Sequence, residues 1–161
     1  MRAGTIGIWA LAVLLAKPTL AALPQQYKDL QAQFDQEGDP VRRAKLMVKL
    51  SEADFKEIRA RLKGQDNTGA LALLQQLRED AKTCDSQLES RAGSAEQHPA
   101  GFKDLQIAMR QSLRRLDDLM TGLTSDEQPP FQAVRADFEE IDRRLIRQLF
   151  PHQPNDPEPK P

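Results

Sequence analysis

The chain is poor in the residues that most often carry enzyme chemistry. Its 161 residues include one cysteine, Cys84, and two histidines, His98 and His152, while aromatic residues make up only 5%. Neither histidine belongs to a zinc-binding motif, and the methionines fall on or near apolar faces rather than clustering as copper ligands. Glycine-rich phosphate loops, GxSxG elbows and HExxH motifs are missing. The sequence therefore predicts no catalytic residue, no cofactor and no metal site.

Cys84 is the one residue that could suggest a reactive thiol. It has no neighbouring histidine to act as a base, and it lies far beyond the position where a lipid anchor would follow an export leader. With Leu77, Ala81 and Leu88 it completes an apolar stripe at helical spacing, which predicts a buried and unreactive thiol. An intermolecular disulfide is the alternative, because oxidising compartments allow it.

The charge balance excludes a strongly basic protein. The chain has 23 Lys and Arg residues against 24 Asp and Glu residues, which gives a net charge of −1. Removal of a leader that contains Arg2 and Lys17 would bring the net charge to about −3. Phosphate backbones require a basic surface, so we expect no nucleic-acid partner.

The first residues have the three-part layout of a secretory signal. Arg2 precedes an apolar run over 6–16, and small residues follow up to Ala21 and Ala22. A run of about eleven residues is too short to span a bilayer, which needs about twenty. We therefore predict a signal peptide over 1–22, cleaved after Ala21 or Ala22, and export to the periplasm or the extracellular space. We expect no transmembrane segment in the mature chain.

Glycine and proline gather at the edges of four long stretches, 41–63, 70–92, 102–121 and 131–150. Both residues disfavour helix interiors, and each stretch has apolar residues at alternating three- and four-residue steps, as one helix face requires. The apolar positions include Val48, Phe55 and Ile58 in the first stretch, Leu74, Leu77 and Cys84 in the second, Leu105, Met109 and Leu116 in the third, and Phe138, Ile141 and Leu145 in the fourth. Tyr27, Leu30 and Phe34 indicate a shorter leading helix.

The four stretches predict rods of similar length, about 30–35 Å at 1.5 Å per residue, and short loops favour antiparallel neighbours. We therefore expect an all-α fold, an up-down antiparallel four-helix bundle over 23–150 with coiled-coil-like spacing and a short leading helix. The segment 151–161 has a proline at nearly every second or third position, which predicts a disordered tail. The expected helix caps are Asp39 with Pro40, one of Asp66, Asn67 and Thr68, and Ser125 with Asp126.

Carboxylates and basic residues recur four positions apart, which predicts ion pairs along exposed helix faces. The predicted pairs are Glu52–Lys56, Glu57–Arg61, Glu139–Arg143 and Glu140–Arg144. Two Arg-Arg pairs, 114–115 and 143–144, both lie toward the C-terminal part of their helices. Antiparallel neighbours would place them at opposite ends of the fold.

Two fragments resemble known families. The segment 138-FEEIDRRLIRQLF-150 resembles the first helix of all-helical chorismate mutases, and this resemblance implies that Arg135 would bind a substrate carboxylate. That family continues with further helices that supply an arginine, a lysine and a Glu or Gln, whereas this chain enters its proline-rich tail. The segments 123-LTSDEQ-128 and 50-LSEAD-54 are similar to the Leu-Thr-x-x-Gln motifs of periplasmic stress chaperones of the Spy and CpxP type.

These features together favour an exported, non-catalytic helical protein of the bacterial cell envelope that binds a protein partner. Such a protein would work through helix faces or through its proline-rich tail. The alternatives are a stress chaperone of the Spy and CpxP type, a secreted chorismate-mutase-like enzyme, and a self-associating helical protein. The sequence itself does not identify the partner or the oligomeric state.

Overall fold

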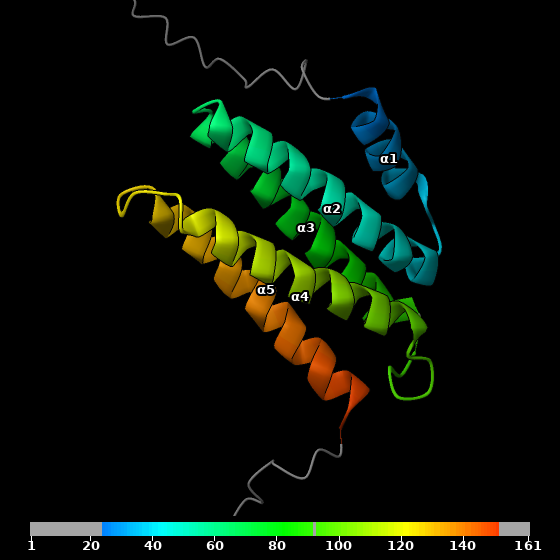
Figure 1. The fold of residues 1–161 in the computed structure, drawn as a ribbon. Coiled ribbons are helices and arrows are strands. Elements are labelled where there is room, and N and C mark those ends of the chain that lie inside the picture. The colour runs from blue at the N-terminus through cyan, green and yellow to red at the C-terminus, as the bar shows by residue number, and fades with distance from the viewer. Residues whose placement is uncertain (1–23, 92, 152–161) are drawn as a thin grey trace, which may run out of the picture.

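The computed structural model describes residues 24–91 and 93–151, and within them the chain forms five helices and no strand. These helices are α1 (Gln25–Gln36), α2 (Pro40–Lys63), α3 (Asn67–Arg91), α4 (Ala100–Met120) and α5 (Gln128–Leu149), as Figure 1 shows. The all-α prediction and the short leading helix are confirmed. The predicted signal peptide over 1–22 and the tail beyond Pro151 lie outside the described residues.

Two of the three predicted helix caps are formed. The Asp39 side chain accepts a hydrogen bond from the backbone N–H of Arg42 at 2.8 Å, and Asp66 accepts one from the backbone N–H of Gly69 at 2.9 Å. Each bond satisfies a donor that the first turn of a helix leaves free.

The predicted cap of α5 by Ser125 or Asp126 is wrong. The residue before α5 is Glu127, and its carboxylate accepts bonds from the backbone N–H and the hydroxyl of Thr124, both at 2.9 Å. Pro129 and Pro130 occupy the first turn of α5 and carry no N–H group. A side-chain cap would therefore find few donors there.

α2, α3, α4 and α5 enclose one apolar core. The helical spacing of the apolar residues is confirmed, because the core consists of the positions that recur on one face of each helix. Its fully covered side chains include Leu50, Ile58, Leu74, Leu77, Leu105, Met109, Leu116, Phe138 and Leu145. Cys84 belongs to the same core, with 1% of its surface exposed. Val48 and Leu62 are only partly buried against it.

The packing of these helices is compatible with a bundle, but the neighbours are not all antiparallel. Helix α2 packs chiefly on α3 and α4, and α5 packs on α4 and α3, whereas α2 and α5 do not approach each other. The pairs Gln106–Asp142 and Asp117–Arg135 show that α4 and α5 run in opposite directions. Helices α3 and α5 run in the same direction, as their paired residues show: Lys82–Asp137, Asp85–Arg144 and Glu89–Gln148.

Gly69 and Gly101 lie inside the first turns of α3 and α4, whereas the sequence suggested that every glycine lies between helices. At Gly101 the reason is close packing. A Cβ atom there would lie 2.6 Å from Cδ2 of Leu88 and 3.1 Å from the backbone Cα of Val41. The start of α4 can therefore meet both α2 and α3 only because residue 101 has no side chain.

Replacement of Gly101 by alanine should destabilise the fold. Leu88 is fully buried, so it has little room to move away from the added methyl group. We expect the free energy of unfolding of Gly101→Ala to fall by about 1–3 kcal/mol, as overpacking of a core typically does. Urea denaturation followed by circular dichroism measures this change. Gly38→Ala is the control, because an added Cβ at Gly38 meets nothing within 4 Å; equal effects of the two substitutions would contradict the packing argument.

Candidate functional site

A group of buried acids fixes α1 to the rest of the fold. The Tyr27 hydroxyl of α1 donates a hydrogen bond to Asp54 of α2 at 2.6 Å. Asp80 of α3 accepts bonds from Gln31 at 3.3 Å and from Gln76 at 3.0 Å. Burial raises the pKa of Asp54 to about 7, with a smaller contribution from the nearby Asp80, and burial also raises the pKa of Asp80. Since these acids are bonded to groups on neighbouring helices, their role is to attach α1.

Arg43 completes the attachment at the other end of α1. Its guanidinium donates to the carbonyl oxygens of Phe34 at 3.1 Å and Asp35 at 2.8 Å, and to the Gln87 side chain at 2.9 Å. It also lies over the Phe34 ring, 5.1 Å from the centroid. A cation at the C-terminal end of a helix is favourable because the last carbonyl groups there lack partners. Figure 1 shows the result, with α1 lying along the outer side of α2.

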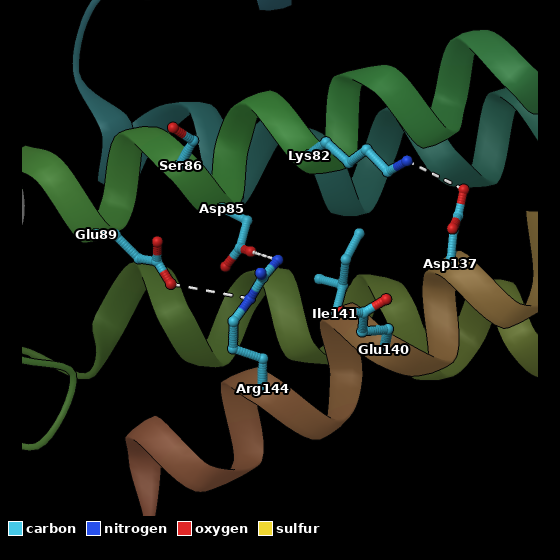
Figure 2. A pocket seen from close by; sticks show the side chains of 8 residues that line it. All are labelled: Lys82, Asp85, Ser86, Glu89, Asp137, Glu140, Ile141 and Arg144. Carbon is cyan, nitrogen blue, oxygen red and sulfur yellow. Dashed lines mark hydrogen bonds and ion pairs between the residues drawn. The ribbon is translucent and has the colours of Figure 1, made fainter.

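A first surface hollow, of about 310 Å³, lies between α3 and α5. Figure 2 shows Lys82 reaching toward Asp137, and Arg144 reaching toward Asp85 and Glu89. Nζ of Lys82 lies 3.0 Å from Oδ2 of Asp137. Arg144 forms an ion pair with the buried Asp85, and Nε of Arg144 lies 3.8 Å from Oε1 of Glu89. Burial raises the pKa of Asp85 to about 6, although Arg144 acts in the opposite direction. Both cations of this hollow are therefore neutralised by the chain itself.

A second and larger hollow, of about 680 Å³, lies between residues 49–63 of α2 and Arg115 of α4. We call it the basic groove. Its charged residues are five cations and one acid, Lys49, Lys56, Arg59, Lys63, Arg115 and Glu52, and its apolar residues are Ala53, Phe55 and Ala60.

The cations of the basic groove lack internal counterions. None of the five takes part in an ion pair within 4 Å among the ion pairs of the described residues. In addition, Nη1 of Arg115 is buried and has no hydrogen-bond acceptor among the described residues. The basic groove thus differs from the α3–α5 hollow, where the cations are paired.

Only one of the four ion pairs predicted at four-residue spacing is formed in the described part of the chain. Glu57 and Arg61 lie 3.3 Å apart. The other three predictions are wrong because the basic side chains have different surroundings. Arg144 turns to α3, Arg143 bonds the carbonyl oxygen of Glu139 at 3.4 Å, and Lys56 stays unpaired in the basic groove.

Four residues discussed from the sequence have defined positions in the structure. Cys84 is a free, buried thiol whose pKa burial raises to about 12, so the predicted core position is confirmed. Arg135, the residue that the chorismate mutase resemblance marks, lies 2.6 Å from Asp117 and 3.1 Å from Glu139. Its guanidinium is therefore already bonded to two carboxylates. Because α4 and α5 are antiparallel, Arg115 and Arg144 lie toward opposite ends of the fold, as predicted.

Sequence reasoning missed the basic groove and the buried acids. A signal for the groove was present, since Lys49, Lys56 and Lys63 recur every seven residues and therefore share one side of α2. For Asp54, the signal is its place beside Phe55 and one turn before Ile58, on the apolar face of α2.

The comparisons with known proteins give no relative. No protein-family model, no curated protein and no solved structure matches the chain. In the described part of the chain, no helix combines the length and the apolar character that crossing a membrane requires. Over the same residues, no three or more His, Cys, Asp or Glu side chains gather in a way that could hold a metal ion.

Asp54 should make stability depend on pH. Its raised pKa means that the folded protein binds the proton more tightly than the unfolded chain, so the contribution of Asp54 is present at acidic pH and is lost as the pH rises from about 4 to about 7. Asp54→Asn keeps an acceptor for Tyr27 but removes the titration. We expect a flatter dependence of the free energy of unfolding on pH than in the wild type, and a more stable variant at pH 8.

Urea unfolding at several pH values between 4.5 and 8 measures this difference. The matched control is Asp118→Asn, which removes an exposed carboxylate and should leave the pH dependence unchanged. The free energy of unfolding of Asp54→Asn should still depend on pH to some extent, because burial also raises the pKa of Asp80 and Asp85. A pH dependence of Asp54→Asn identical to that of the wild type would contradict the assignment.

Proposed function

We propose that the protein is an exported, non-catalytic helical protein of the bacterial cell envelope that binds a protein partner. In this proposal α2–α5 form an up-down four-helix unit, and α1 is fixed to its outer side. The observation that carries the proposal is the basic groove, in which five cations lie together without carboxylate partners from the described chain.

The basic groove is costly for the fold by itself. Arg59 and Lys63 are like charges at four-residue spacing, and such pairs destabilise a helix by about 0.2–0.5 kcal/mol. A buried donor without an acceptor, such as Nη1 of Arg115, costs about 1–3 kcal/mol. Neither feature helps the core to form. Binding of an external acidic group would offset the repulsion between the exposed cations, which supports a role in recognition.

The groups with the most perturbed pKa values support a binding protein rather than an enzyme. Asp54 and Asp80 are bonded to side chains on α1 or α3, and Asp85 is paired with Arg144 of α5. Cys84 is enclosed in the core and its pKa is raised, which disfavours the reactive thiolate. Perturbed groups of this kind serve packing when they join neighbouring helices.

Export rests on the predicted signal peptide, and a partner would then be met in the envelope. A second candidate function is that of a stress chaperone of the Spy and CpxP type. The segment 123–128 lies at the turn before α5, and its last residue begins that helix, which is the position that the similar chaperone motifs occupy. In a chaperone, the basic groove would bind acidic segments of many unfolded proteins instead of one partner.

Site-specific crosslinking in cells tests the proposal. A photoreactive phenylalanine analogue replaces Ala60 in the basic groove, or Ala136 on the exposed side of α5 as the matched control. We expect Ala60 to give a reproducible adduct with one protein of the envelope fraction, and Ala136 to give none.

Each result has a distinct meaning. A ladder of many adducts from Ala60 would favour the chaperone. An adduct from Ala136 alone would keep a protein-binding function but would assign it to another face. If neither position gave a reproducible protein adduct, the proposed function would be wrong.

A further inference from the structure

We propose that the basic groove binds an acidic α-helix of the partner, laid along α2. This inference rests on the proposed protein-binding function and specifies the chemistry of the partner. It is drawn from the spacing of the groove residues and from their charge.

The groove residues of α2 follow the spacing of a helix–helix contact. Lys49, Ala53, Lys56, Ala60 and Lys63 are separated by steps of four, three, four and three residues. That spacing forms a single stripe along a helix, the pattern by which coiled-coil helices meet. This stripe points away from the core, because all three lysines and Ala60 are exposed. Helix α2 therefore has a second face suited to another helix.

Alanine in the stripe allows close approach. Small side chains let the backbone of a second helix come near, so Ala53 and Ala60 would form the floor of the contact. Phe55 also lines the groove, but only 2% of its surface is exposed, so it offers little apolar surface for the partner helix to bury. The contact energy would then depend mainly on charge, which predicts a reversible interaction that is sensitive to salt.

The charge pattern fits carboxylates on a helix better than carboxylates on an extended strand. Successive lysines of the stripe are about 10.5 Å apart, at 1.5 Å per residue. A helix that carries Glu or Asp every seven residues repeats the same distance on one face. A strand covers about 10 Å in three residues, and residues three apart point to opposite faces of a strand. The stripe from Lys49 to Lys63 extends for about 21 Å, or about four helical turns.

Arginine side chains of the basic groove would help to fix the position of the partner helix. Arg59 of α2 and Arg115 of α4 both line the groove, and a guanidinium group can hold a carboxylate by two parallel hydrogen bonds.

A membrane surface is a poorer fit than an acidic helix. Basic surfaces that bind membranes usually add large apolar side chains that enter the bilayer. Among the described residues, the exposed large apolar side chains are Ile107 and Phe150, and neither lines the basic groove. The basic groove is also a hollow, and its apolar lining consists of Ala53, Phe55 and Ala60.

A synthetic helix provides the test. The probe is a fluorescein-labelled Ala- and Leu-containing peptide of about five helical turns with Glu every seven residues, and the matched peptide has Gln in place of Glu. Fluorescence anisotropy with the full mature chain measures binding. We expect the Glu peptide to bind, to bind about tenfold more weakly at high salt, and to bind much more tightly than the Gln peptide.

Two variants of equal charge change locate the binding surface. The groove variant is Lys56→Gln, Arg59→Gln and Lys63→Gln, and the control variant is Lys28→Gln, Lys103→Gln and Arg147→Gln, three exposed cations outside the groove. We expect the groove variant to lose at least about tenfold in affinity, and the control variant to stay within about twofold of the wild type. Circular dichroism checks that both variants remain folded.

Several outcomes would overturn the inference. One is that the wild type fails to bind the Glu peptide, and another is that the two variants lose affinity for it equally. A third such outcome is that phosphatidylglycerol vesicles or inorganic phosphate bind to the groove in place of the peptide. Self-association through the groove, seen by sedimentation of the wild type alone, would assign the surface to a second copy instead. If the peptide fails but Ala60 or Ala136 still crosslinks one envelope protein, only this inference fails and the proposed function stands.

Discussion

Burial of one apolar core among α2, α3, α4 and α5 is the constraint on which the rest of the structure depends. The core consists mostly of leucine, phenylalanine and alanine, and the helices must pack closely to bury these side chains together. Gly101 shows how close that packing is, because even one methyl group would meet Leu88 and the backbone of Val41. Cys84 serves as another small apolar residue of this core, and its chemistry is suppressed by burial.

Polar residues are used in three different ways around this core. Under α1, buried acids and Arg43 join helices through hydrogen bonds. Between α3 and α5, cations are neutralised by carboxylates across the hollow (Figure 2). In the basic groove, five cations lie together, and none of them forms an ion pair with a carboxylate of residues 24–91 or 93–151. Although the net charge of the chain is close to zero, the charges are unevenly distributed over its surface. This uneven distribution of charge suggests a binding surface.

The helices, their core faces and the environment of Cys84 could be predicted from the sequence because they depend on local spacing. The caps by Asp39 and Asp66 were predictable for the same reason, whereas the α5 cap was not formed because Pro129 and Pro130 supply no donors. Which helices are neighbours was not predictable, since spacing does not determine whether α2 packs on α4 or on α5. Three of the four predicted ion pairs are not formed in the described residues, because spacing within one helix does not show that Arg144 meets Asp85 of α3 or that Lys56 lies in the basic groove.

The cations of the basic groove should repel one another on the surface of the folded protein. The thermal unfolding midpoint, followed as ionic strength rises, measures this repulsion, since salt screens repulsion between exposed charges. We expect the midpoint of the wild type to rise with salt, and this rise to be clearly smaller in the variant Lys56→Gln, Arg59→Gln and Lys63→Gln. A wild-type midpoint that falls with salt, or the same salt dependence in both proteins, would show that the groove cations do not repel one another.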